Sequence, residues 1–284
     1  MRIEESRAPG ALHVQLQRIA WLPEVDGPDA VVIAHGYAEH SGRYGHVAAA
    51  LVEDGFAVHA LDHRGHGRSE GPLVNVENFQ HYIDDLDALV LDVKARHRGA
   101  TFLLGHSMGG LIAADYATQH QDRLSGLVLS GPAVMRRKVS PMLNLTARVL
   151  ARIAPGAGVL KLPLDAISRD PEVVSRYQAD PLVHDVPMRA RQAVQSVDAQ
   201  GRLEPRMASI SIPLLVIQGS DDRIVDPASA AFIHDRVGST DRTIKIYEGL
   251  YHEILNEPER ATVLADLRAW LAAHRGSPQT TVQP

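Results

Sequence analysis

Cysteine is absent from the 284 residues of this chain. Its absence excludes a thiol nucleophile, disulfide bonds and thiolate metal sites, but it does not distinguish a cytosolic protein from an exported one. The sequence also lacks any stretch of about 18 apolar residues, which argues against a membrane span. The formal net charge of −5 gives no electrostatic footprint for nucleic acid.

Repeats and low-complexity segments are absent as well. Residues 1–10 are charged and have no apolar core, so we expect no signal peptide in the sequence as given. The hydrophobic content of 45% suits a globular protein with a substantial core, and short apolar runs that alternate with helical patterns favour one α/β domain. We expect a cytoplasmic protein, with peripheral membrane association left open, and a disordered tail at 275–284.

A GxSxG pattern is centred on Ser107. Gly105 and Gly109 lack the Cβ atoms that would collide where a strand turns sharply into a helix, so the serine can hold a strained backbone with its hydroxyl exposed. An apolar strand is predicted at 101–105 and a helix at 108–120, whose N-terminus points at the reacting centre. This context predicts a nucleophilic serine, which needs a base to act.

A second buried strand is predicted at 30–34, and it ends in His35-Gly36-Tyr37. The loop that follows such a strand can supply a backbone N–H to an oxyanion, and the residue after the nucleophile supplies another. The candidate oxyanion hole therefore consists of the backbone N–H groups of Tyr37 and Met108.

Further strands are predicted at 56–60, 124–130, 212–218 and 243–247. Asp221 and Asp222 follow the third of these, and His252 follows the last. The resulting chain order of serine, acid and histidine is the order expected of an α/β-hydrolase. Because neighbouring residues in an extended loop point in different directions, we expect Asp222 to orient His252 and Asp221 to cap the loop through backbone N–H groups.

His252 is one of 15 histidines and is distinguished by its place after the last strand. Three others surround Asp62 and suggest a metal site, namely His59, His63 and His66. We interpret this segment as a structural loop after a strand and predict no metal site. Four further histidines are expected to be exposed on helices: His46, His81, His97 and His120.

Seven segments of the chain match one known pattern: HGYAEHSGRY at 35–44, DHRGHGRS at 62–69, GHSMGG at 105–110, ISRDP at 167–171, DPLVH at 180–184, QGSDDR at 218–223 and YEGLYH at 247–252. In these segments the chain resembles the monoacylglycerol lipase family of the α/β-hydrolase superfamily, among lysophospholipase-like and serine aminopeptidase-like hydrolases. The resemblance runs from about residue 10 to residue 274. It implies a mostly parallel central sheet flanked by helices, with an inserted helical cap.

The resemblance also implies site residues. Its nucleophile falls on Ser107, its acid on Asp222 and its base on His252, with the oxyanion N–H groups on Tyr37 and Met108. Four positions match polar residues near the glycerol end of the family's substrate: Glu39, Arg43, His106 and Tyr177. The chain departs from the pattern at residue 38, where alanine stands in place of the usual glycine, and at residue 37, where the usual residue is smaller. We therefore expect an oxyanion loop of different shape.

About 75 residues between the strands at 124–130 and 212–218 contain no obvious core strand, which is too long for an ordinary connection. We predict a hydrolase core at 1–132 and 208–274 and an inserted cap at 133–207. Apolar residues recur near helical spacing in the first part of the cap: Met142, Leu143, Leu145, Val149, Leu150 and Ile153. They predict a lid that accommodates an acyl chain and touches a lipid surface, with packing on the core as the alternative.

The predicted reaction is hydrolysis of a monoacylglycerol to fatty acid and glycerol through an acyl-enzyme, without a metal or an organic cofactor. The expected partner is that ester or a similar lipid, with transient membrane contact through the cap and no nucleic acid. Lysophospholipase, general carboxylesterase and serine aminopeptidase activities would use the same triad. A non-catalytic ligand receptor on the same scaffold is the alternative from another class, and the oligomeric state stays open.

Overall fold

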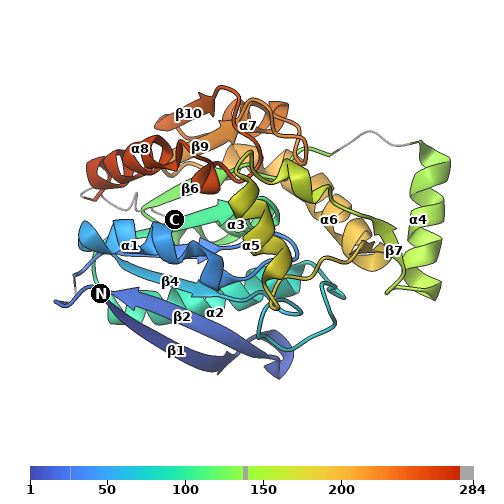
Figure 1. Cartoon of the computed structure of the whole chain (residues 1–284), viewed down its shortest axis with the longest axis horizontal. Helices are drawn as coiled ribbons and strands as arrows, with labels where there is room; N and C mark the ends of the chain where they lie inside the picture. The colour runs from blue at the N-terminus through green and yellow to red at the C-terminus, as the bar shows by residue number, and fades with distance from the viewer. Residues whose placement is uncertain (26, 137–139, 276–284) are drawn as a thin grey trace.

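A computed structural model describes residues 1–25, 27–136 and 140–275. Eight strands form one sheet in the spatial order β1-β2-β4-β3-β5-β6-β9-β10 (Figure 1). Their bounds are β1 (Arg2–Pro9), β2 (Gln15–Leu22), β3 (Ala30–Ala34), β4 (Ala57–Leu61), β5 (Thr101–His106), β6 (Gly126–Ser130), β9 (Leu214–Gly219) and β10 (Arg242–Tyr247). Strand β2 pairs antiparallel with β1 and β4, and the remaining pairs are parallel. The predicted mostly parallel central sheet is confirmed.

Helices cover both faces of this sheet (Figure 1). Their bounds are α1 (Gly45–Glu53), α2 (Gln80–Arg96), α3 (Met108–His120), α4 (Pro141–Ile153), α5 (Pro171–Ala179), α6 (Ala190–Leu203), α7 (Ala228–His234) and α8 (Arg260–Ala273). Strand side chains alternate between the faces, so Val32 joins the core formed with α2 and α3, while Val31 and Ile33 join the core formed with α1 and α8. Both faces are buried, which explains why these strands read as continuous apolar runs.

The predicted strands are all present, with ends that differ by no more than two residues, and the predicted helix at 108–120 coincides with α3. The antiparallel pair β1 and β2 has no counterpart in the sequence-based interpretation. Strand β1 forms the edge of the sheet, and all but one of its residues are exposed and carry no apolar alternation. Nothing in such a segment distinguishes a strand from a loop before its partner is known.

None of the four histidines expected on exposed helical faces is fully exposed: His46, His81 and His120 are half-buried, and His97 is buried. His97 terminates α2 as its C-cap and is only 5% exposed. Its Nε2 atom lies 3.0 Å from Nε2 of His59. The expectation was wrong because the chain leaves helical geometry at this residue and turns the ring back toward the sheet.

The segment between β6 and β9 stands apart from the sheet. Within its described residues, β7 (Gly158–Leu160) and β8 (Met188–Arg189) form a separate two-stranded ribbon. Helix α4 packs on α6 and projects from the body of the molecule (Figure 1). Five of its apolar side chains are exposed: Met142, Leu143, Leu145, Val149 and Ile153. None of the helices within 1–25, 27–136 and 140–275 is long and apolar enough to cross a bilayer.

Nine of the ten residues of the predicted tail, 276–284, lie outside the described residues. The first residue of that tail, Arg275, contacts the core: its guanidinium stacks 3.9 Å from the ring centroid of Phe56, and its Nη2 donates to the carbonyl oxygen of Asp54.

Candidate active site

Ser107 occupies the sharp turn between β5 and α3. Its φ of 55° and ψ of −116° are strained for a residue with a side chain. A Cβ atom on Gly105 would lie 2.3 Å from the carbonyl oxygen of Gly109, and one on Gly109 would lie 2.1 Å from the carbonyl oxygen of Ala34. Both glycines are therefore required sterically, as the GxSxG pattern predicts. The strained turn is held in place by β3 and β6, which lie on either side of β5.

A carboxylate and an imidazole meet at the same edge of the sheet. Asp222 follows β9 and His252 follows β10, and Oδ2 of Asp222 lies 2.6 Å from Nδ1 of His252. The amide of Gln218 donates to the same oxygen at 2.7 Å. The other oxygen accepts the backbone N–H groups of Ile224 and Val225 at 2.8 and 2.9 Å. The carboxylate is thus fixed on all sides and directed at the imidazole.

The prediction that Asp221 caps the loop is wrong, because Asp222 makes these contacts. Asp222 both contacts His252 and caps the loop through its Oδ1. Asp221 is exposed, and the hydrogen bond of its side chain comes from the hydroxyl of Ser220. A carboxylate has two oxygens that accept in different directions, so one residue can serve both purposes.

Ser107 and His252 converge on the end of β6. The backbone N–H of Ser107 donates to the carbonyl oxygen of Ser130 at 2.9 Å, and the next residue, Gly131, lies against the His252 ring, 3.2 Å from where its Cβ would stand. His106 directly precedes Ser107, and the centroid of its ring lies 4.7 Å from that of His252. The structure thus brings the three residues predicted as a triad to one sheet edge.

The two imidazoles at this edge titrate differently. Burial lowers the pKa of His252, but the Asp222 carboxylate with its hydrogen bond, and the charges of Glu253 and Glu39, together outweigh burial and raise this pKa above the usual 6.5. Burial and the neighbouring His252 lower the pKa of His106 to about 4. His106 is therefore neutral at pH 7, and its Nδ1 lies 3.2 Å from the hydroxyl of Ser130.

Ser107, Tyr37 and Met108 line one cavity of about 320 Å³. Most of the remaining lining is apolar. Leu111 of α3 contributes to it, and the segment between β6 and β9 contributes Leu160, Leu162, Met188 and Val197. The loop at Tyr37 carries Ala38 with φ of 64°, the left-handed conformation that glycine adopts without strain. The carbonyl oxygen of Ala38 accepts the backbone N–H of His184 at 2.9 Å, so that segment is tied to this loop.

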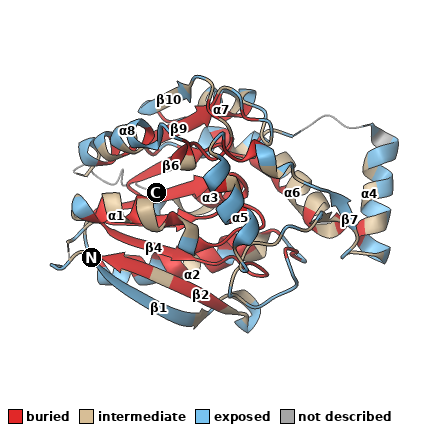
Figure 2. Cartoon of the chain, viewed as in Figure 1, coloured by how far each residue is buried: buried red, intermediate tan, exposed pale blue. Residues whose placement is uncertain are grey.

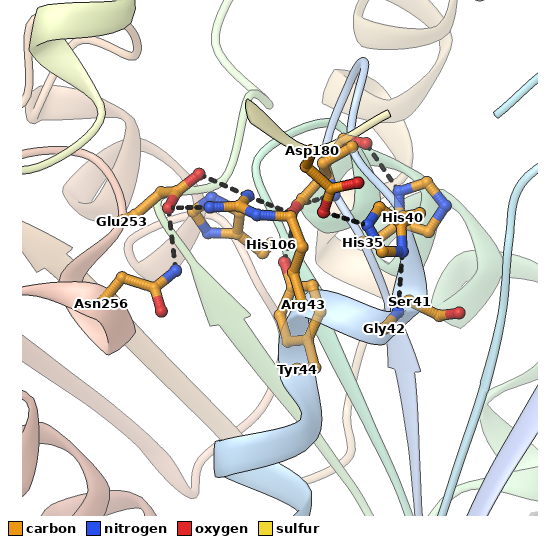
Figure 3. A network of polar contacts seen from close by, with 12 residues as sticks. His35, His40, Ser41, Gly42, Arg43, Tyr44, His106, Asp180, Glu253 and Asn256 are labelled. Carbon is orange, nitrogen blue, oxygen red and sulfur yellow. Dashed lines mark hydrogen bonds and ion pairs between the residues drawn. The ribbon is translucent and has the colours of Figure 1, made fainter. Parts of the chain in front are cut away.

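The polar residues matched to the glycerol end lie in two settings. Arg43 and Tyr177 line a second cavity of about 350 Å³ and stack on each other, 4.6 Å from guanidinium carbon to ring centroid. Glu39 and His106 are buried, at 3% and 4% exposure. The Glu39 carboxylate accepts from Nη1 of Arg43. Nη1 and Nη2 of the same guanidinium donate to Glu253 (Figure 3).

Two contacts at the site were missed from the sequence. Glu253 directly follows the predicted base, and this adjacency was its only signal. Nε2 of His40 lies 2.9 Å from Oδ2 of Asp180, a contact between residues 140 positions apart (Figure 3). No local pattern predicts such a pair.

The loop around Asp62 is structural in its contacts. Its Oδ1 accepts the backbone N–H and the hydroxyl of Ser41, and its Oδ2 accepts the backbone N–H of Arg68 at 2.8 Å. Within residues 1–25, 27–136 and 140–275 no three histidine, cysteine, aspartate or glutamate side chains are arranged to hold a metal ion.

The chain is similar to known proteins over most of its length. A family model described as serine aminopeptidase, S33, matches residues 28–259. A monoacylglycerol lipase from Mycolicibacterium smegmatis is 43% identical, over 96% of this chain and 98% of its own. A phospholipase, YtpA, from Bacillus subtilis is 36% identical, over 88% of this chain and 98% of its own. The crystal structure of Paleococcus ferrophilus monoacylglycerol lipase superposes with a TM-score of 0.80 at 31% identity, covering 96% of this chain and 100% of that one.

The fold and the sheet-edge site define an α/β-hydrolase. Within that superfamily the chain belongs to the serine aminopeptidase S33 family, with relatives named monoacylglycerol lipase. It is an enzyme of the ester hydrolase class, and the predicted family resemblance is confirmed.

Proposed function

We propose that this chain hydrolyses monoacylglycerols to a fatty acid and glycerol, with Ser107 as nucleophile. The observation that carries the proposal is the 2.6 Å contact between Asp222 and His252 at the sheet edge where the strained Ser107 stands. In the first step His252 takes the proton of the Ser107 hydroxyl as the oxygen attacks the ester carbonyl. Asp222 keeps the Nδ1–H tautomer of the imidazole, so Nε2 is free to act as the base.

The tetrahedral intermediate carries its negative charge toward the backbone N–H groups of Tyr37 and Met108. His252 then returns the proton to the leaving glycerol oxygen, and the acyl group stays on Ser107 as an ester. Water, deprotonated by the same histidine, attacks this ester and releases the fatty acid. The serine regains its proton, so no cofactor is required by the scheme.

The two cavities support a division of the substrate. The apolar cavity that Ser107 lines suits an acyl chain. The glycerol end would lie at the matched polar positions, Glu39, Arg43, His106 and Tyr177. Arg43 and Tyr177 line the second cavity, which is called the polar cavity below because most of its lining residues are polar or charged. Residues 133–207 would act as a cap over a core at 1–132 and 208–274, because apolar side chains of this segment line the first cavity.

Membrane contact through the cap is part of the proposal. The exposed apolar side chains of α4 form one side of an amphipathic helix, which suits the interface of a lipid surface. Contact of this kind would bring a lipid ester to the cavity without a membrane span.

A substrate panel tests the proposed activity. The rate of hydrolysis of a monoacylglycerol is compared with those of the diacylglycerol and the lysophospholipid that carry the same acyl chain. An aminoacyl amide completes the panel, and Ser107→Ala is the control. We expect preference for the monoacylglycerol and a loss of roughly four to six orders of magnitude in the variant. Near-wild-type turnover by Ser107→Ala would refute the assignment of the nucleophile.

The phospholipase relative favours lysophospholipid hydrolysis as a second candidate. The catalytic residues would be the same, and the polar cavity would take a phosphate-bearing headgroup in place of glycerol. A higher kcat/KM for the lysophospholipid in the same panel would select it. Stoichiometric labelling by a fluorophosphonate without turnover of any ester would instead indicate a ligand receptor.

A further inference from the structure

The peptide group between Gly36 and Tyr37 is held in one orientation. The carbonyl oxygen of Gly36 lies 2.8 Å from Nδ1 of His35, and Nε2 of the same ring accepts the backbone N–H of His63 at 2.9 Å. A carbonyl oxygen only accepts, so Nδ1 carries the hydrogen and the ring is the neutral tautomer. Because this carbonyl and the Tyr37 N–H belong to one planar unit, the direction of that N–H is fixed.

A buried carboxylate holds the other side of Gly36. Oε1 of Glu39 accepts the backbone N–H of Gly36 at 2.6 Å and the hydroxyl of Tyr44 at 2.8 Å, while Oε2 accepts Nη1 of Arg43 at 2.5 Å. Burial raises the pKa of Glu39, but the Arg43 guanidinium, the imidazoles of His106 and His35 and the Gly36 N–H together outweigh it, and the pKa falls to about 2. The loop is therefore anchored to Arg43 through an ionised group.

The same guanidinium reaches the loop of the catalytic histidine. Nη1 and Nη2 of Arg43 donate to the two carboxylate oxygens of Glu253 at 2.8 and 2.7 Å, a bidentate pair. The amide of Asn256 donates to Glu253 at 2.8 Å (Figure 3). Both oxygens of Glu39 and both of Glu253 are thus taken up by protein donors.

We propose that Glu39, Arg43 and Glu253 are positioning residues, which form a bridge between the loop that presents the Tyr37 N–H and the loop that presents His252. This inference rests on the proposed function, in which those two groups act on the same ester carbon. It gives the bridge a role beyond any contact with glycerol. Because both loops act on the transition state, loosening the bridge lowers kcat and leaves KM little changed.

The bridge also places charge near the catalytic histidine. Asp222 after β9 and His106 at the end of β5 contact His252 directly. The carboxylates of Glu253, on its own loop, and of Glu39, before α1, act on it through their charge. The Arg43 guanidinium binds both of these carboxylates. Burial lowers the pKa of His252, and the carboxylates of Asp222, Glu253 and Glu39 raise it. Neutralising Glu253 therefore lowers this pKa and moves the acid limb of kcat/KM to lower pH.

Two substitutions separate geometry from charge. Glu253→Gln removes the charge and the ion pair, whereas Glu253→Asp keeps the charge and shortens the reach to Arg43. Each is assayed across pH on a monoacylglycerol and on the 4-nitrophenyl ester of the same acyl chain, which has no glycerol. We expect kcat to fall roughly 10- to 100-fold on both esters in both variants, with the acid limb displaced only in Glu253→Gln.

Glu259→Gln is the matched control. Glu259 lies on the same loop and shares Arg169 with Glu257, as Glu253 shares Arg43 with Glu39, but it is half exposed at the surface. We expect its kinetics to equal those of the wild type. If Glu253→Gln fails to fold, Asn256→Ala replaces it, because it removes one donor to Glu253 and should reduce kcat on both esters by a smaller factor.

Three results would overturn the bridge. A rise in KM for the monoacylglycerol alone, with an unchanged rate on the 4-nitrophenyl ester, would assign these residues to glycerol binding. Unchanged kinetics in folded Glu253 variants would remove any role, and a fall matched by Glu259→Gln would show a general loop effect. A wild type with no turnover that depends on Ser107 would instead refute the proposed function itself.

Discussion

Apolar side chains are buried in the strands that carry the site, whereas several are exposed in the segment between β6 and β9. In β3, β5 and β6 every residue is buried. At the edge around Ser107, Gly105 and Gly109 pack directly against backbone carbonyl oxygens, and the Asp222 carboxylate contacts His252. Most of α4 is exposed (Figure 2), and its Met142 and Ile153 side chains are 78% and 77% exposed. The contrast indicates that the edge is built for fixed geometry, while α4 presents apolar surface that a monomer in water leaves uncovered.

The largest test of the fixed edge is Asp222→Asn. The amide cannot hold the Nδ1–H tautomer of His252, so kcat should fall by roughly four orders of magnitude while the fold is retained. Steady-state hydrolysis and circular dichroism measure the two effects. A fall of less than tenfold would mean that the edge tolerates a misoriented imidazole.

Gly109→Ala tests the steric side of the same edge. The new methyl group would stand 2.1 Å from the carbonyl oxygen of Ala34, and backbone cannot yield as a flexible side chain can. We expect a loss of about 3 kcal/mol or more in the free energy of unfolding. Gly156→Ala, in the β6–β9 segment with nothing near its Cβ, serves as control and should change little. Equal effects in chemical denaturation would contradict the comparison.

The pH profile probes the electrostatics of the edge. The folded enzyme holds the pKa of His252 above 6.5, because the carboxylates of Asp222, Glu253 and Glu39 together exceed the opposing effect of burial. The base works in its neutral form, so kcat/KM should fall as the pH drops through a value above 6.5. A limb well below 6.5 in the wild type would contradict this electrostatic account.

The smallest expected effect on folding comes from α4. The double variant Met142→Ser, Leu145→Ser changes exposed residues, so the free energy of unfolding should move by less than about 0.5 kcal/mol. Binding to phosphatidylcholine and phosphatidylglycerol vesicles should weaken roughly tenfold, because two apolar side chains no longer enter the lipid. Ile246→Ser removes an apolar side chain that is 48% exposed on β10, away from α4, and should leave binding unchanged. Equal vesicle binding by all three proteins would exclude α4 as the lipid contact.

The same contrast explains how much could be predicted from the sequence. The elbow at Ser107 and the placing of Asp222 and His252 after their strands depend on short local patterns, and the buried parallel strands show as apolar runs. The bridge from Arg43 to Glu253 joins residues 210 positions apart, and the loop-capping role of Asp222 depends on how the chain turns after β9. The bridge arises from tertiary packing, which local spacing does not reveal. The cap is a local contact with Ile224 and Val225, and either of the two adjacent aspartates could have made it.

Helix α4 shows the opposite case. Its apolar spacing was readable in the sequence, but the spacing alone left open whether those side chains pack on the core or face outward. The exposure of Leu145, at 64%, answers that question for the chain on its own. The vesicle experiment tests whether a lipid surface covers the exposed apolar side chains of α4.

The most direct test of the central claim is labelling with a fluorophosphonate, followed by peptide mass spectrometry, in the presence and absence of a monoacylglycerol. The account predicts one phosphonate per chain, on Ser107, with a labelling rate that falls as the monoacylglycerol concentration rises and is lost in His252→Ala. Labelling at another residue, or at Ser107 with a rate indifferent to the monoacylglycerol and to His252, would contradict it.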